Sequence, residues 1–162
     1  MRTVLTWVLA AGLGLWAASS VAGPFEDALV AAQAGEFATA VSLLRPLAEA
    51  GEPASQYNLG ILYANGGGVE QDYVEAANLY GLAARQGHAG AQMNLGALYG
   101  NGWGVERDFS EAFIWLSLAA AQGNLEAPEL RDLAASQLSA EELAAARVRS
   151  GTYWEQYVVP FQ

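Results

Sequence analysis

The sequence predicts an all-α fold in which pairs of antiparallel helices repeat, and three observations lead to this prediction. Two consecutive stretches match each other at a constant offset of 36 residues without a gap, alanine is abundant, and glycines recur where each helix should end. Alanine favours helix, and self-similarity at a period of roughly 20 to 50 residues is typical of repeat architectures. A length of 162 residues fits one domain.

The two matching stretches define the organisation of the chain. Residues 55–72 read SQYNLGILYANGGGVEQD, and residues 91–108 read AQMNLGALYGNGWGVERD. An earlier half-copy at residues 37–51 obeys the same offset. We expect five segments: a signal peptide at 1–22, an N-terminal capping helix pair at 23–53, repeats at 54–89 and 90–124, and C-terminal capping helices with an aromatic tail at 125–162.

The first helix of each repeat is short and amphipathic. Leu59, Leu62 and Tyr63 lie at helical spacing on one face, and the second repeat has the same residues 36 positions later. Gly60 and Gly96 stand inside these helices, where glycine costs about 1 kcal/mol relative to alanine. Their recurrence at one place indicates close helix packing that any side chain would obstruct.

The second helix of each repeat opens with an aspartate. Asp72 and Asp108 are suited to capping free backbone amides at the helix start. Glu75 and Glu111 follow three residues later, so we expect a capping box in both copies.

A further helix is predicted beyond the repeats. Ser139 and Glu142 form another capping-box pattern, which predicts a helix from about Ala140 to Arg149. The aromatic side chains of residues 151–162 should fold back onto the last helices, since exposed aromatics are costly.

These residues resemble the Sel1-like repeat, a relative of the tetratricopeptide repeat. The family pattern runs Ala-x-x-x-Leu-Gly-x-x-Tyr, then Gly-x-Gly-Val-x-x-Asp, then Ala-x-x-Trp-x-x-x-Ala-Ala-x-x-Gly. The positions that match in the second repeat are Ala91, Leu95, Gly96, Tyr99, Gly102, Gly104, Val105, Asp108, Ala112, Trp115, Ala119, Ala120 and Gly123. The first repeat departs at Ser55 and Leu79. The resemblance covers residues 54–123 closely and implies a right-handed α-solenoid that acts as an adaptor between proteins.

The resemblance also implies where a partner would bind. In such solenoids the first helices line the concave surface, which here would expose six residues. They are Tyr57, Asn58, Ile61, Met93, Asn94 and Ala97. In the tetratricopeptide class an asparagine at the place of Asn58 and Asn94 binds peptide backbone or a terminal carboxylate, and its amide both donates and accepts. The alternative is that the two asparagines brace adjacent repeats and that Tyr57 and Met93 pack between them.

Composition excludes several kinds of chemistry and partner. The chain has 17 acidic residues against seven basic ones, all arginine, and no cysteine. Without lysine there is no Schiff base, no Walker phosphate loop and no Ser-x-x-Lys acylation site. Without cysteine there is no disulfide and no thiolate metal site. The acidic balance disfavours nucleic acid and anionic membranes as partners.

The sequence offers little for catalysis. His88 is the single histidine and stands where the first repeat has Glu52, which we interpret as a solvated turn. One histidine cannot form a histidine zinc cluster, and no Gly-x-Ser-x-Gly elbow is present. We expect no enzymatic activity, no metal and no cofactor.

The N-terminus predicts export. One positive charge precedes an apolar stretch from Val4 to Ala18, and the small residues 20–22 suit a signal peptidase. We expect cleavage after Ala22 and a periplasmic protein. The alternative is an uncleaved membrane anchor, since roughly 20 apolar residues span a bilayer.

The sequence therefore predicts a non-catalytic adaptor of the cell envelope that binds a protein or peptide segment on its concave face. The alternatives are a structural subunit of an envelope or secretion assembly and, least favoured, a cell-wall-active hydrolase. The sequence names no partner.

Overall fold

The computed structural model describes residues 23–162, and these residues form helices and no strand. The helices are α1 (Pro24–Gln33), α2 (Phe37–Glu49), α3 (Pro53–Asn65), α4 (Tyr73–Ala84), α5 (Ala89–Asn101), α6 (Phe109–Ala121), α7 (Ala127–Ala135), α8 (Ala140–Tyr157) and the short 3-10 helix η1 (Val159–Phe161). The predicted signal peptide lies outside the described residues. Within those residues, no helix combines the length and apolar character needed to cross a membrane.

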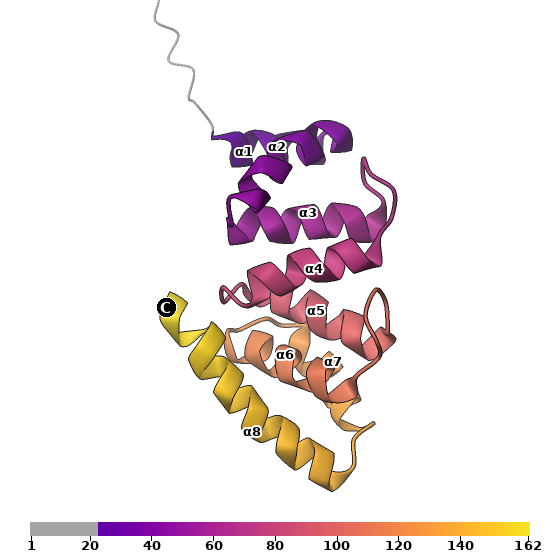
Figure 1. Cartoon of the computed structure of the whole chain (residues 1–162), viewed down its shortest axis with the longest axis vertical. Helices are drawn as coiled ribbons and strands as arrows, with labels where there is room; N and C mark the ends of the chain where they lie inside the picture. The colour runs from indigo at the N-terminus through magenta and orange to yellow at the C-terminus, as the bar shows by residue number, and fades with distance from the viewer. Residues whose placement is uncertain (1–22) are drawn as a thin grey trace, which may run out of the picture.

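The helices stack in chain order, and the molecule is an α-solenoid (Figure 1). Each helix from α1 to α6 packs against the one that follows it. The last long helix, α8, departs from this order because it packs against α6 and runs diagonally along one side of the stack (Figure 1). The predicted all-α solenoid with a C-terminal capping helix is confirmed.

Two groups of buried side chains form the core. One lies among α1 to α4 and the other among α4 to α8, and Tyr63 packs against both. Many of the buried residues are alanines, whose small side chains allow the helices to approach closely. The core is therefore continuous along the stack, as expected for repeats that bury their apolar faces on each other.

The aspartate caps are present, but the capping boxes predicted for α4 and α6 are not formed. Asp72 accepts hydrogen bonds from the backbone of Val74 and Glu75, and Asp108 does the same one repeat later. The backbone N–H of Asp72 already donates to the Tyr63 carbonyl at 2.9 Å, and that of Asp108 donates to the Tyr99 carbonyl at 3.0 Å. A glutamate therefore has no free donor to accept from, and that part of the prediction was wrong.

The capping box predicted at Ser139 and Glu142 is confirmed, but the end predicted for its helix was wrong. The helix α8 continues past Arg149 to Tyr157. Gly151 lies inside it with no atom near its open side. The cost of a helical glycine, about 1 kcal/mol, is offset because the aromatic residues beyond it pack against the core.

The glycines inside the first helices lie where the prediction placed close packing. A Cβ atom on Gly60 would lie 2.7 Å from the ring of Tyr80, and one on Gly96 would lie 2.7 Å from Cγ of Leu116. Each glycine therefore lets the two helices of its own repeat come together. The prediction of close packing at both positions is confirmed.

Candidate partner-binding surfaces

One candidate surface is a groove of about 330 Å³ formed mainly by α3 and α5. We call it the asparagine groove. It is lined by Ile61, Ala64, Asn65, Tyr73, Tyr80, Asn94, Ala97, Leu98, Asn101 and Trp103. Three of the six residues predicted to contact a partner, Ile61, Asn94 and Ala97, therefore lie together in it.

The asparagine groove is polar without being charged. Its lining includes three asparagines and no acidic or basic side chain. Trp103 forms one wall, with its ring 5.1 Å from that of Tyr73 and half of its surface exposed. Asparagine side chains both donate and accept, and exposed aromatics supply apolar contact area. This combination suits the backbone and apolar side chains of a neutral peptide segment.

The other three predicted residues do not line this groove. Tyr57 stacks on His88, with ring centres 4.4 Å apart, and so packs between repeats. The Asn58 side chain donates to the Ala54 carbonyl of its own helix at 2.8 Å. Met93 is partly buried against the core. Partner contact at the six residues stays a prediction.

Glutamines form the bracing between repeats that was considered for the asparagines. Gln92 is fully buried and donates to the Ala84 carbonyl at 3.0 Å, while its own carbonyl accepts from Gln122 at 2.6 Å. Gln56 makes the equivalent bonds, to Ala48 at 3.1 Å and from Gln86 at 2.9 Å. The signal in the sequence was the recurrence of both glutamines at the 36-residue offset.

Tyr80 lies at the back of the asparagine groove. Burial raises the pKa of its hydroxyl to about 12, and the neighbouring Asn94 side chain opposes this shift. The hydroxyl therefore stays protonated at neutral pH. It adds a neutral polar group beside Asn94, consistent with the uncharged character of the groove.

His88 is a structural residue rather than the solvated turn that the sequence predicted. Its Nδ1 accepts a hydrogen bond from the backbone of Ala91 at 3.1 Å and so caps α5. Burial lowers the pKa of the imidazole, which favours the neutral form that can accept this bond. The side chain is half-buried against Tyr57, a contact that its position in a turn did not reveal.

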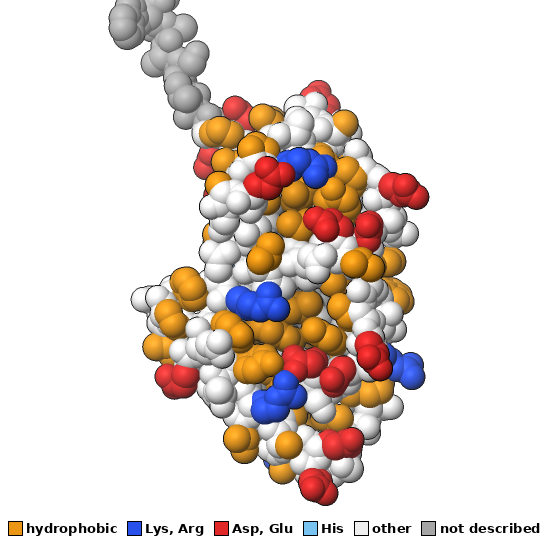
Figure 2. All heavy atoms as spheres, viewed as in Figure 1, with side chains coloured by type: hydrophobic (Ala, Val, Ile, Leu, Met, Phe, Trp, Pro, Cys, Tyr) orange, Lys and Arg blue, Asp and Glu red, His pale blue; other side chains and the backbone are white. Residues whose placement is uncertain are grey.

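A second and larger candidate surface lies between α4, α6 and α8, with a volume of about 940 Å³. We call it the tyrosine groove. It is lined by Ala77, Asn78, Gly81, Leu82, Arg85, Leu95, Tyr99, Val105, Glu106, Arg107, Asp108, Glu111, Trp115, Tyr153 and Tyr157. Figure 2 shows hydrophobic side chains gathered beside α8 in the lower half of the molecule, with arginine and acidic side chains around them.

Aromatic contacts hold α8 against the repeats and form one wall of the tyrosine groove. The Trp115 ring lies 5.2 Å from that of Tyr153 and 5.6 Å from that of Tyr157. Arg149 pairs with Glu111 and also donates to the Tyr153 hydroxyl at 3.2 Å. The prediction that the aromatic tail folds back is confirmed for these two tyrosines, while Phe161 is 57% exposed.

Sequence reasoning missed the tyrosine groove. Its wall requires α8 to continue beyond Arg149 and to cross α6, and neither feature was predicted. The available signal was the four-residue spacing from Arg149 to Tyr153 to Tyr157, which places all three side chains on one helical face. Within residues 23–162, no group of three or more histidine, aspartate or glutamate side chains is arranged to hold a metal ion.

The fold and the repeated glycines, caps and glutamines define a helical repeat protein. More narrowly, the Sel1 repeat model matches residues 53–88 and 89–124, so the chain carries two Sel1 repeats and the predicted resemblance is confirmed there. No curated protein matches the chain.

Several solved structures are similar to this chain, and two of them illustrate the likeness. The first is c5321, a protective antigen present in uropathogenic Escherichia coli strains that displays an SLR fold, with 33% identity and a TM-score of 0.80. That match covers 88% of this chain and 32% of the antigen. The second is a Sel1 repeat protein from Oxalobacter formigenes, with 40% identity, a TM-score of 0.52, and coverage of 53% of this chain and 66% of that protein. The chain thus spans only part of each.

Sel1 repeat proteins typically act as adaptors that bind other proteins, and their fold is generally non-catalytic.

Proposed function

We propose that this chain is a non-catalytic adaptor that binds a segment of a partner protein in the asparagine groove. The observation that carries the proposal is the grouping of Ile61, Asn94 and Ala97 with the half-exposed Trp103 in one uncharged groove. Exposed aromatic side chains next to groups that donate and accept hydrogen bonds are common at protein interfaces.

The composition of the groove narrows the chemistry of the partner. Because no charged side chain lines it, a strongly charged segment would lose its hydration without gaining a counter-charge. A neutral segment with apolar side chains avoids this cost. Its backbone would exchange hydrogen bonds with the asparagines while a side chain packs on Trp103.

We also propose that the adaptor works in the periplasm after export. The support is the pattern of residues 1–22, with one positive charge, an apolar stretch and small residues before Gly23. Fractionation of cells that express the full chain with a C-terminal tag tests this. A shortened product in the periplasmic fraction is expected, whereas a full-length product in the cytoplasm or membrane would contradict it.

Site-specific photo-crosslinking tests the binding surface. A benzoylphenylalanine placed at Ala97, inside the groove, should give one discrete adduct in cells, and Trp103→Ala in the same chain should reduce it several-fold. The matched control is the same probe at Ala144, an exposed alanine of α8 outside the groove. Equal adducts at both positions, or an adduct at Ala97 that ignores Trp103→Ala, would contradict the placement.

The alternative function is that of a structural subunit of an envelope assembly. Such a subunit would differ from an adaptor in the number of copies per complex. Light scattering of the purified chain distinguishes the two functions. An adaptor is expected to remain a small species alone and to form a complex of fixed ratio with the crosslinked protein, whereas open-ended growth of the particle would favour the assembly.

A further inference from the structure

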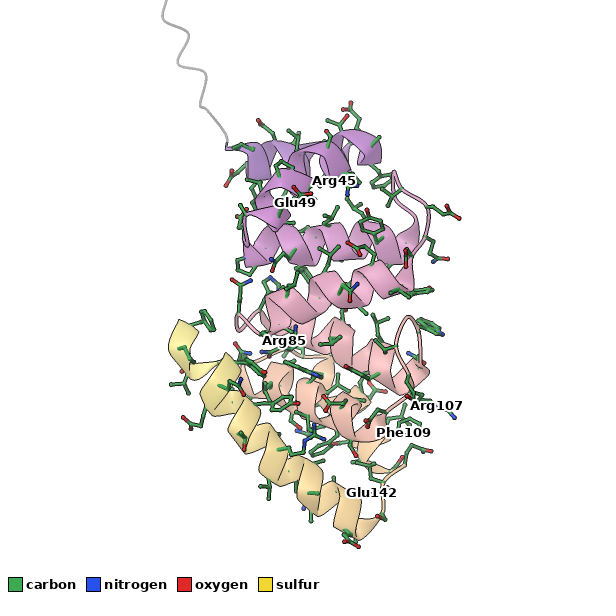
Figure 3. The ribbon with its side chains drawn as sticks, viewed as in Figure 1. Arg45, Glu49, Arg85, Arg107, Phe109 and Glu142 are labelled. Atoms are coloured by element: carbon green, nitrogen blue, oxygen red, sulfur yellow. The ribbon has the colours of Figure 1, made fainter. Side chains whose placement is uncertain are left out.

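Arg85 is a positive charge at the tyrosine groove that lacks a counter-charge. It follows the last residue of α4, is exposed, and lies on the side of the stack that α8 crosses (Figure 3). Within residues 23–162, no carboxylate lies within 4 Å of its guanidinium. Of the six arginines in this part of the chain, Arg131 and Arg149 form ion pairs, and Arg85 is one of the four that do not.

The Arg85 guanidinium lies close to Gly81. A Cβ on Gly81 would lie 3.5 Å from Nη1 of Arg85, so the arginine side chain folds back over the glycine one turn earlier in the same helix. The charge of Arg85 also affects the pKa of the Tyr99 hydroxyl. Burial and Glu111 raise the pKa of Tyr99, and Arg85 acts in the opposite direction. A hydroxyl that can donate and a guanidinium therefore line the same groove.

The other charges of the groove already have roles. Glu111 pairs with Arg149, and the Asp108 carboxylate caps the start of α6. Arg107 lies over the Phe109 ring at 5.6 Å, away from Arg85, and Glu106 beside it is exposed (Figure 3). The Arg85 end of the groove thus offers positive charge, and the exposed Leu82 and the partly exposed Tyr157 add apolar surface.

We propose that the tyrosine groove binds the free carboxyl terminus of an apolar peptide. Charge complementarity assigns the carboxylate to Arg85, with the Tyr99 hydroxyl donating a second hydrogen bond. The last side chains of the peptide would pack on Leu82, Tyr153 and Tyr157. A volume of about 940 Å³ is large enough for a few residues. A single carboxylate on an apolar chain suits a single guanidinium better than a polyanion, which the acidic surface repels.

This site is separate from the asparagine groove and does not rest on the proposed adaptor function. The two grooves share no lining residue. They also differ in charge, since the asparagine groove has none. A peptide whose binding depends on its terminal carboxylate would therefore report on the tyrosine groove alone.

Calorimetric titration of the purified chain with a matched pair of peptides tests the proposal. The pair is acetyl-Ala-Leu-Phe with a free carboxylate and the same peptide as its C-terminal amide. The free acid should bind at least about tenfold more tightly than the amide. Arg85→Gln should remove this preference, whereas Arg147→Gln, which removes an exposed arginine of α8 outside the groove, should preserve it.

Three results would overturn the proposal. One is equal affinity for acid and amide, or no saturation by either peptide at millimolar concentration. Another is a wild-type preference in Arg85→Gln, whose folding is checked by circular dichroism. The third is saturable binding of decanoate without binding of the peptide acid, which would assign the groove to a fatty acid. Retention of the preference in Trp103→Ala is expected, because that residue belongs to the other groove.

Discussion

The packing of α2 on α3 and that of α4 on α5 follow the same scaffold, but one face differs between them. Arg45 of α2 donates to the Tyr63 hydroxyl of α3 at 3.1 Å. The residue 36 positions later is Gly81, so the equivalent Tyr99 has no arginine at the position of Arg45, and the tyrosine groove lies there. The residue one helical turn later also differs in charge, since Glu49 corresponds to Arg85. This difference indicates that residues specific for a ligand are to be expected at positions where equivalent helices differ in sequence.

The shared positions carry the architecture, as the equal geometry of both units shows. Gly60 and Gly96 admit a neighbouring helix, Asp72 and Asp108 cap the following one, and each buried glutamine joins one repeat to the helix before it. Changes at these positions should affect stability in both repeats alike. Changes at the divergent positions should affect binding and leave stability nearly unaltered.

The largest effect is expected from the buried glutamines. Gln92→Leu should lower the free energy of unfolding by about 2–3 kcal/mol, because the Ala84 carbonyl and the Gln122 amide lose their partner. Gln56→Leu should cost a similar amount if the repeats are equivalent. Urea denaturation measures both, with the exposed Gln156→Leu as control, for which a change within about 0.5 kcal/mol is expected. A loss of stability in only one of the two variants would show that the two glutamines are not equivalent.

Close packing at the helical glycines should give the next largest effect. Gly96→Ala should destabilise by about 1–2 kcal/mol, since the new methyl would lie 2.7 Å from Cγ of Leu116. Gly151→Ala is the matched control, because its helical position in α8 is open, and it should stabilise by roughly 0.5–1 kcal/mol. Thermal unfolding of the two variants checks the signs, and a stabilising Gly96→Ala would refute the packing role.

A smaller and pH-dependent effect distinguishes the two repeats at the start of their first helices. Burial lowers the pKa of His88 below its ordinary value of 6.5, so the unfolded chain binds a proton more readily than the folded one. The stability that neutral His88 contributes is present above about pH 6.5 and is lost as the pH falls through the folded pKa. The first repeat has Glu52 here and no histidine titration.

The variant His88→Asn should keep the cap and abolish this histidine component. The measurement is the urea midpoint of wild type and variant between pH 7.5 and pH 5. Wild type should lose more stability over this range than the variant. Parallel curves for the two proteins would show that His88 does not titrate in the manner described.

Features that repeat could be predicted from the sequence, because the same residue at the same offset indicates one structural role. Gly60, Gly96, Asp72 and Asp108 are the clearest examples. The predicted capping boxes do not form, because the backbone amide that each requires already donates to a tyrosine carbonyl of the preceding helix. Local sequence patterns carry no information about such a competing bond.

The candidate sites were only partly predictable for a related reason. Three of the six predicted contact residues line the asparagine groove, because they lie on the first helices, where the repeat pattern indicates which face is exposed. The tyrosine groove depends on α8 crossing α6, a contact between residues about forty positions apart, as in the pair Arg149–Glu111. Gly151 indicated a helix end, and only packing of Tyr153 and Tyr157 on Trp115 shows why the helix continues.

The central claim is that Gly81 and Arg85, which stand where the preceding helix pair has Arg45 and Glu49, make the tyrosine groove able to bind a carboxylate. The double variant Gly81→Arg/Arg85→Glu restores the arrangement of Arg45 and Glu49, and a Cβ at position 81 meets only ordinary contacts. Titration of wild type and this variant with the peptide acid, side by side, is the most direct test. Saturable binding by wild type and none by a folded variant is the predicted result, and equal binding by both would contradict the claim.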